Sequence, residues 1–318
     1  MVRKNKDLLG LNVISEEEME EILDTARRMK SILLQDNRKT NDLQGKSIIT
    51  LFYENSARTR LSFELASKYM GANAANVSAS SSSVSKGETL VDTARTIDRM
   101  GADVIVLRHP MSGAPHLLAK HVRASVINAG DGMNEHPTQA LLDIFTIREK
   151  KGSIKGRKVA IIGDIAHSRV ARSNVWGLTA LGAEVWLAGP SSLIPPEIEK
   201  TGAKVTFQIE EALRGADVVM GLRLQKERQS SGFLPSLREY SRYFGINERN
   251  LKYADPNAMV MHPGPVNRGV ELTSDVRSSK GAVIDEQVTN GVAVRMALLY
   301  LLAGRRSERK EEQSACCV

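Results

Sequence analysis

The hydrophobic pattern between residues 48 and 71 predicts a buried strand, a sharp corner and a helix. Residues 48–53 (IITLFY) form an apolar, β-rich run of strand length. After Ser56, apolar residues recur every four positions, as on one face of a helix: Leu61, Leu65 and Tyr69. Ser56 is a good N-cap for this helix, and Gly71 is a good stop.

Strand and helix patterns alternate along the rest of the chain. An earlier helix opens with a capping box formed by Ser15 and Glu18, and its apolar stripe consists of Met19, Ile22, Leu23 and Ala26. Further strands are predicted at residues 73–79, 103–107, 125–129, 158–163, 184–188, 204–207, 217–221 and 258–261. Further helices are predicted to follow K-G-E-T at residues 86–89 as far as residue 100, to cover residues 137–151 and 285–302, and to start at Arg169, with helical segments around Pro195 and Ile209. This alternation in a chain of 318 residues predicts an α/β fold with two doubly wound parallel-sheet domains linked by long helices.

Composition narrows the class of partner. The net charge of +7 and the pI near 9.4 suit anionic ligands. Aromatic residues make up only 4% of the chain and no basic stripe is interleaved with them, so we expect no nucleic-acid binding. No apolar run is long enough to span a membrane, and the first residues lack the apolar core of a signal peptide.

The two cysteines, Cys316 and Cys317, are adjacent and form neither a disulfide framework nor a metal-ligand pattern. We therefore expect a protein of the reducing cytoplasm with no metal site. The segment at residues 305–318 is expected to be a disordered tail.

The corner after residues 48–53 is a candidate anion site. It places Ser56, Arg58, Thr59 and Arg60 at a helix N-terminus, where free N–H groups and the helix dipole attract anions. Cations oppose the dipole there, so two arginines suggest a bound anion, although a merely solvated cationic turn is the alternative. The glycines of a nucleotide phosphate loop are absent.

Further candidates follow other predicted strands. Arg108, Arg169 and Arg223 lie at or near the ends of strands, where ligands of open α/β sheets bind. Only the first glycine of a dinucleotide-binding G-x-G-x-x-G pattern is present after residues 158–162, which disfavours a dehydrogenase.

Five motifs in one order resemble the aspartate/ornithine carbamoyltransferase family. They are S-x-R-T-R at residues 56–60, K-G-E-T at 86–89 after a serine-rich loop, H-P-T-Q at 136–139, R-x-Q-x-E-R at 223–228, and H-P-G-P at 262–265. Two positions depart from the usual pattern, because Ala57 replaces a Ser or Thr and Gly264 replaces a Leu.

The resemblance implies a carbamoyl-phosphate-binding domain of residues 1–137 plus 288–304 and an aspartate-binding domain of residues 138–287. It implies transfer of the carbamoyl group of carbamoyl phosphate to the amine of L-aspartate, the early committed chemistry of pyrimidine synthesis, without a metal or an organic cofactor. The catalytic residues it implies are Arg58, Thr59, Arg108, His136 and Lys86. The implied carbamoyl phosphate ligands are these five with Ser56, Gln139, Ser82, Pro263 and Gly264, and the implied aspartate ligands are Lys86, Arg169, Arg223 and Gln225.

Two alternatives remain open at this stage. One is a carbamoyltransferase for ornithine or a related amino acid, although that branch has a cysteine in the loop at residues 262–265 and needs an acidic partner for the ornithine ammonium. The other is a non-enzymatic phosphometabolite-binding protein on the same fold, which the complete set of motifs disfavours. Since Lys86 resembles a residue lent to a neighbouring subunit, the resemblance also implies a homotrimer with shared sites, to which regulatory or other pyrimidine-pathway chains could bind.

Overall fold

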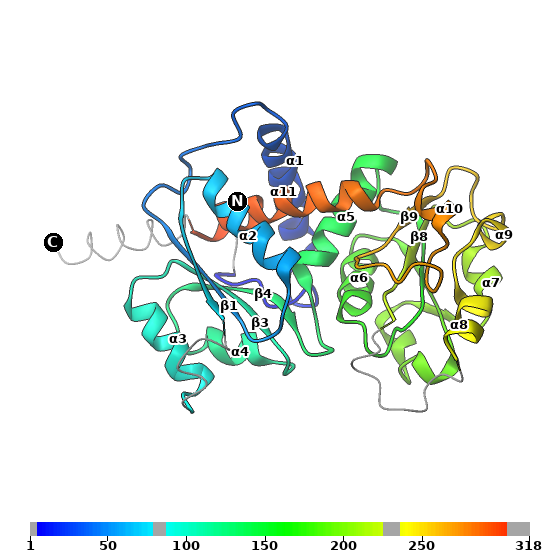
Figure 1. The fold of residues 1–318 in the computed structure, drawn as a ribbon, viewed down its shortest axis with the longest axis horizontal. Coiled ribbons are helices and arrows are strands. Elements are labelled where there is room, and N and C mark those ends of the chain that lie inside the picture. The colour runs from blue at the N-terminus through cyan, green and yellow to red at the C-terminus, as the bar shows by residue number, and fades with distance from the viewer. Residues whose placement is uncertain (1–4, 79–86, 225–235, 304–318) are drawn as a thin grey trace. The chain divides into compact units, whose positions relative to one another are not determined.

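The computed structural model describes residues 5–78, 87–224 and 236–303 and contains two parallel β-sheets (Figure 1). The chain divides into two compact units, one within Met1–Thr138 and Thr289–Val318 and the other within Gln139–Val288. The two domain boundaries expected from the sequence lie one residue from these divisions. The predicted fold class, α/β with two parallel sheets, is confirmed.

The first sheet has four parallel strands in the order β2-β1-β3-β4. These strands are β1 (Ser47–Phe52), β2 (Asn73–Ser78), β3 (Val104–His109) and β4 (Ser125–Asp131). Strands β3 and β4 are buried almost continuously, as expected of a parallel sheet covered by helices on both faces. Arg108 was expected just after a strand, and it is instead the next-to-last residue of β3.

Helices cover both faces of this sheet (Figure 1). They are α1 (Glu16–Leu33), α2 (Ala57–Tyr69), α3 (Leu90–Arg99), α4 (Ala114–Ala119) and the later part of α11 (Ile284–Ala303). Helices α3 and α4 bury Ala94, Ile97 and Leu118 against Ile105 and Leu107 of β3.

The later part of α11 packs against α1 and α2 in the first unit. The guanidinium of Arg28 in α1 lies 4.5 Å from the ring centroid of Tyr300. The guanidinium of Arg295 lies 5.3 Å from the ring centroid of Phe63 in α2. The last predicted helix therefore returns to the first unit, as the family resemblance implied.

The predicted buried face of α2 was wrong. Leu61 is 55% exposed, whereas Phe63 and Ala66 are fully buried together with Met70 just beyond the helix. Both sets have helical spacing, so the pattern alone does not choose between them. The choice is made by packing, because Phe63 is the residue that meets Arg295 of α11.

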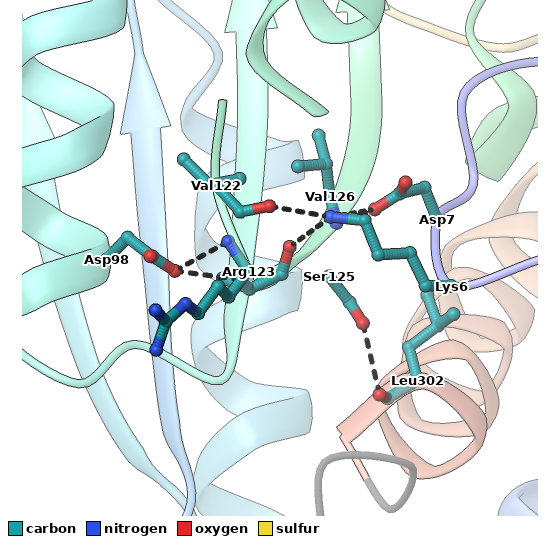
Figure 2. A network of polar contacts seen from close by, with 9 residues as sticks. Lys6, Asp7, Asp98, Val122, Arg123, Ser125, Val126 and Leu302 are labelled. Atoms are coloured by element: carbon teal, nitrogen blue, oxygen red, sulfur yellow. Dashed lines mark hydrogen bonds and ion pairs between the residues drawn. The ribbon is translucent and has the colours of Figure 1, made fainter. Parts of the chain in front are cut away.

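A polar network ties the N-terminal end of β4 to three other parts of the first unit (Figure 2). One carboxylate oxygen of Asp98 in α3 accepts the N–H groups of residues 123 and 124 at 3.1 and 2.8 Å. The Asp7 carboxylate accepts the N–H of Val126 at 2.8 Å, and the Ser125 hydroxyl donates to the Leu302 carbonyl at 3.3 Å. These bonds satisfy backbone groups at the amino end of the strand, away from the carboxyl end where β4 leads into the H-P-T-Q motif.

The second sheet has five parallel strands in the order β7-β6-β5-β8-β9. These strands are β5 (Lys158–Ile162), β6 (Glu184–Ala188), β7 (Lys204–Thr206), β8 (Val218–Gly221) and β9 (Met259–Met261). The helical elements of this unit are α5 (Pro137–Lys151), α6 (Arg169–Ala180), η3 (Ser191–Leu193), η4 (Ile198–Thr201), α7 (Ile209–Leu213), α8 (Leu237–Phe244), α9 (Glu248–Leu251) and α10 (Ser274–Arg277).

The core of the second unit is aliphatic. Ile209 and Leu213 of α7 pack against Ala160 and Ile162 of β5. Val159 and Ile161 alternate with these residues along the strand and are equally buried, so both faces of the sheet are covered.

The sequence pattern did not predict α4, α8, α9 and α10. The last two contain only four residues each, which is too short for a periodic pattern. By contrast, α5 begins and ends at the predicted residues, and α1 has the predicted capping box. No helix in the described parts of the chain combines the length and apolar character needed to cross a membrane.

Candidate active site

Four of the candidate residues lie at the topological switch points of the two sheets. In the first sheet the strand order reverses between β1 and β3, and in the second it reverses between β5 and β8. Open parallel sheets bind ligands beyond the carboxyl ends of the strands at such points. Ser56 follows β1 and Arg108 belongs to β3, while Arg169 follows β5 and Arg223 follows β8.

The N-terminus of α2 is the turn that the sequence predicts to bind an anion in the first unit. Ser56 occupies the N-cap position, but its hydroxyl makes no capping hydrogen bond, contrary to the expected use of this side chain. The first N–H groups of a helix have no carbonyl partner within it, and no acidic residue lies in this first turn. Arg58 is exposed, whereas Thr59 is only 8% exposed. A pocket opens directly beside this turn, lined by Phe52, Glu54, Asn55, Ser56, Ala57 and Arg60.

Arg108 is held in place by its neighbours at the same switch point. Its Nε lies 3.3 Å from a carboxylate oxygen of Glu54, and its Nη1 donates to the Ala129 carbonyl at 3.3 Å. The side chains of Arg108 and Glu54 are 14% and 21% exposed. This partial burial and the contacts on two sides restrict the rotamers of Arg108 before any ligand binds.

His136 follows a turn that is organised around Asp131. Both oxygens of this fully buried carboxylate accept backbone N–H groups, from Glu135 at 3.1 Å and from Gly113 at 2.7 Å. The side-chain amide of Asn128 donates to the same carboxylate at 2.8 Å. His136 itself is 5% exposed and immediately precedes α5, so its ring is placed by a rigid turn.

The ring of His109 packs at a tilt of 54° against the ring of Tyr53, beside Arg108. Their ring centroids are 4.7 Å apart, and His109 Nδ1 accepts the N–H of Met111 at 3.0 Å. Burial lowers the pKa of His109, and burial raises the pKa of Tyr53. Both rings are therefore neutral near pH 7, and Nε2 of His109 carries the proton because Nδ1 is the acceptor.

In the second unit, the loop after β5 precedes a buried arginine. Asp164 is fully buried, and its Oδ1 lies 3.1 Å from the His167 backbone nitrogen and 2.8 Å from His167 Nδ1. Ser168 caps α6 by accepting the N–H of Ala171 at 3.1 Å. Arg169 is the first residue of α6, as predicted, and is 4% exposed.

Arg223 lies between two anchored leucines after β8. The N–H of Leu222 donates to the Ile162 carbonyl of β5 at 2.9 Å, and the N–H of Leu224 donates to Glu271 at 2.8 Å. Burial raises the pKa of the Glu271 carboxyl, against the effect of the N–H groups that it accepts. Because both flanking residues are fixed, the half-buried Arg223 is held at the switch point of the second sheet.

The loop after β9 turns tightly at Gly264, whose φ of +65° is in the left-handed region. A glycine adopts this conformation without the steric cost that a leucine would have, which gives a physical reason for the departure from the family pattern. The N–H of Gly264 donates to His262 Nδ1 at 2.8 Å, so the ring of His262 braces the loop from within.

Three predicted site residues, Ser82, Lys86 and Gln225, lie outside the described residues, as do Cys316 and Cys317.

Sequence reasoning missed three carboxylates, Glu54, Asp131 and Asp143, which contact predicted site residues or the turn before them. The four-residue spacing between Gln139 and Asp143 on α5 was a usable signal, because such pairs meet on one helix face. Among residues 5–78, 87–224 and 236–303, no group of three or more His, Cys, Asp or Glu side chains is arranged to hold a metal ion.

Comparison with known families identifies the class. Residues 6–149 match the aspartate/ornithine carbamoyltransferase carbamoyl-P binding domain, and residues 155–302 match the aspartate/ornithine carbamoyltransferase Asp/Orn binding domain. The chain therefore belongs to the aspartate/ornithine carbamoyltransferase family of enzymes, as the five motifs indicated.

Individual relatives narrow the comparison. The chain is 71% identical over 307 residues to the aspartate carbamoyltransferase catalytic subunit of Acetivibrio thermocellus, covering 96% of this chain and 98% of the relative. It is also 71% identical to the catalytic subunit of Ruminiclostridium cellulolyticum, covering 95% and 96%. Among solved structures, aspartate transcarbamoylase from Trypanosoma cruzi in complex with carbamoyl phosphate and aspartate has a TM-score of 0.84 and 32% identity, with 94% and 97% of the two chains covered. Ornithine carbamoyltransferase from Pyrococcus furiosus has a TM-score of 0.83 and 33% identity, with the same coverage.

Proposed function

We propose that this enzyme transfers the carbamoyl group of carbamoyl phosphate to the amine of L-aspartate, giving N-carbamoyl-L-aspartate and phosphate. The two solved structures do not separate aspartate from ornithine, since their identities to this chain are nearly equal. Both relatives at 71% identity are named for aspartate. The chemistry of the amino-acid site gives an independent reason for choosing aspartate over ornithine.

The observation that carries the choice of aspartate is the pair of arginines at the second switch point. Arg169 begins α6 after β5, and Arg223 follows β8, the strand next to β5. Guanidinium groups form forked hydrogen bonds with carboxylates, so this pair suits the two carboxylates of aspartate. The side-chain ammonium of ornithine would be repelled there, and the loop at residues 262–265 lacks the cysteine of the ornithine branch.

The first unit supplies the groups for the activated carbonyl and its leaving group. In the proposed mechanism Ser56, Arg58 and Thr59 bind the phosphate at the start of α2, with Lys86 and Ser82 contributed by a neighbouring subunit. The carbonyl oxygen becomes an oxyanion when the amine attacks. Thr59, Arg108 and His136 stabilise that charge as an oxyanion hole.

The second unit orients the amine and the carbamoyl nitrogen. Gln139 and the carbonyls of Pro263 and Gly264 accept hydrogen bonds from the carbamoyl NH₂ and the attacking amine, and Gln225 holds the amino-acid backbone. The amine nitrogen then bonds to the carbamoyl carbon, the carbon–oxygen bond to phosphate breaks, and the departing phosphate takes the amine proton. Carbamoyl phosphate is already an activated mixed anhydride, so the transfer needs no redox step and no organic cofactor.

The assembly belongs to the same proposal. A homotrimer in which Lys86 completes the neighbour's site follows from the K-G-E-T motif, and the pathway position implies a protein of the cytoplasm. Regulatory or other pyrimidine-pathway chains are compatible with this assembly.

The test is carbamoyl transfer by the purified protein with aspartate and ornithine side by side. We expect product with aspartate and none with ornithine at equal concentrations. Product with ornithine alone would overturn the assignment of Arg169 and Arg223. Absence of product with both, in protein that binds carbamoyl phosphate, would instead indicate a binding protein.

A further inference from the structure

Asp143 is a buried carboxylate on α5 that three side-chain amides reach from different parts of the second unit. Its Oδ1 accepts Nε2 of Gln139 at 3.0 Å and Nε2 of Gln287 at 2.7 Å. Its Oδ2 accepts Nδ2 of Asn174 at 2.9 Å. Asp143 and Asn174 are fully buried, and Gln287 is 4% exposed.

This arrangement fixes which way each amide points. An ionised carboxylate has only acceptor positions, so each neighbouring amide must turn its NH₂ group toward Asp143. The oxygen of each amide is then directed elsewhere. For Gln139 this leaves Oε1 as the atom available to a ligand, and Oε1 is only an acceptor.

The hydrogen bonds between Asp143 and the three amides form three branches. The branch through Gln287 continues to the loop after β9. With its NH₂ committed to Asp143, Gln287 accepts the N–H of His262 through Oε1 at 3.0 Å. His262 is 1% exposed, and its Nδ1 accepts the N–H of Gly264 at 2.8 Å. The Gln287 amide therefore anchors the backbone of His262, and the His262 ring in turn anchors Gly264.

The Gln139 and Gln287 branches end at Gln139 Oε1 and at the loop that carries the carbonyls of Pro263 and Gly264. In the proposed function all of these groups bind one ligand atom, the carbamoyl nitrogen. Gln139 Oε1 and the carbonyls of Pro263 and Gly264 are all acceptors, which suits an NH₂ group with two protons to donate. We propose that Asp143 is a positioning residue that makes the site selective for an acyl phosphate bearing NH₂ over one bearing a methyl group. This inference rests on the proposed function, because it concerns the same substrate.

A purely structural role for Asp143 predicts a different result. In that case its loss would weaken the binding of every ligand together with the stability of the unit. The third branch provides a matched control, because Asn174 is as buried as Asp143 and also bonds it, but its NH₂ group additionally donates to the Val170 carbonyl within α6. The Asn174→Ala variant should lower stability without changing selectivity.

The experiment compares the binding of carbamoyl phosphate and acetyl phosphate by calorimetry in the absence of an amino acid. Acetyl phosphate carries a methyl group in place of NH₂ and is otherwise similar in shape. The wild-type protein should prefer carbamoyl phosphate. In Asp143→Leu, which is similar in size but offers no acceptor to the amides of Gln139 and Gln287, the preference should fall by roughly 10- to 100-fold, as expected for one or two lost hydrogen bonds, while acetyl phosphate binding stays within about twofold.

A further variant keeps the test decisive. Gln287→Met breaks one branch while Asp143 remains, and should lower the preference even if Asp143→Leu does not fold.

The outcomes separate the inference from the function. An unchanged preference in folded Asp143→Leu or Gln287→Met overturns the inference, as does an equal loss of affinity for both acyl phosphates. A wild-type protein that fails to transfer the carbamoyl group to aspartate overturns the proposed function instead.

Discussion

The side chain of His136 is expected to lower the activation barrier of the proposed reaction. Replacing His136 by Ala should lower kcat by roughly 10²- to 10³-fold, because one oxyanion donor is removed while the phosphate-binding turn on α2 is untouched. The shape of the pH–rate profile should not change, since the departing phosphate takes the amine proton in the proposed mechanism. Steady-state kinetics between pH 6 and 9 measure both effects.

The matched control for this variant is His121→Ala. His121 is exposed, with Nδ1 3.4 Å from an Nη2 of Arg95, and is remote in sequence from the five motifs. The kcat of the His121→Ala variant should stay within about twofold of the wild-type value. Loss of an inflection of the wild-type profile in His136→Ala would identify His136 as the base and remove that role from the phosphate.

His109 makes stability depend on pH in a defined direction. Burial lowers its pKa in the folded state below the ordinary value of 6.5. Below about pH 6.5 the unfolded chain therefore binds a proton that the folded chain does not, and the free energy of unfolding falls as the pH falls through this window. Above the window both states are neutral at this residue and its contribution does not vary.

The measurement is the urea-unfolding free energy of wild type and His109→Asn at pH 7.5 and pH 5.5. Asn can still accept the Met111 N–H, so the backbone turn is retained. We expect wild type to lose more stability than the variant between the two values. Equal losses would show that His109 ionises as easily in the folded state as in the unfolded state.

At the scale of elements, two serine N-caps should behave in opposite ways. Ser15 caps α1 with its hydroxyl in a complete capping box, whereas Ser56 makes no capping bond at the start of α2. Ser15→Ala should lower the unfolding free energy by about 1 kcal/mol and leave activity unchanged. Ser56→Ala should leave stability nearly unchanged and weaken carbamoyl phosphate binding by roughly 10-fold or more, since a hydrogen bond to a charged group is lost.

Thermal unfolding and carbamoyl phosphate titration of the two variants test this pair. Each variant is the control for the other, because both remove one hydroxyl from a helix N-cap. If Ser56→Ala is destabilised but binds carbamoyl phosphate normally, Ser56 is an ordinary N-cap and not a ligand-binding residue.

At the scale of the whole molecule, the proposed trimer predicts complementation between defective chains. Ser56→Ala and Lys86→Ala each disable a different part of the site. If Lys86 serves a neighbouring chain, hybrids of the two variants contain some sites with neither defect, and activity should return to a fraction of the wild-type value. Mixing, denaturing and refolding the two proteins together, followed by an aspartate assay, measures this recovery.

The control is each variant refolded alone, which should stay well below the activity of the hybrids. Isolated hybrids without recovered activity would contradict the shared site, even if sedimentation showed a trimer.

The order of the motifs allowed the sequence to predict the family and the candidate site residues, and local patterns predicted where two helices begin. Pro137, a favoured first helical residue, correctly began α5, and Arg169 correctly began α6. Local chemistry decides these features, because caps, glycines and strand-length apolar runs act over a few residues. For the same reason the sequence located Arg108, His136 and Arg223 along the chain.

Contacts between distant residues could not be read in the same way. Asp143 meets Gln287 across 144 positions, and on α2 the buried residue is Phe63, which contacts Arg295, rather than Leu61. Nothing in the local pattern specifies such partners, since several faces have acceptable spacing and packing chooses among them.

The sequence by itself determined the alternation of strands and helices and the family, and it predicted anion binding at the strand ends, because these depend on short-range patterns and on motif order. Only the tertiary structure decided which side chains brace the site. Strand order brings β1 beside β3 and β5 beside β8, and this pairing of separated segments creates the switch points. Buried carboxylates such as Asp131 and Asp143 become organising centres only after the fold removes them from water, where their hydrogen bonds must be satisfied by protein groups.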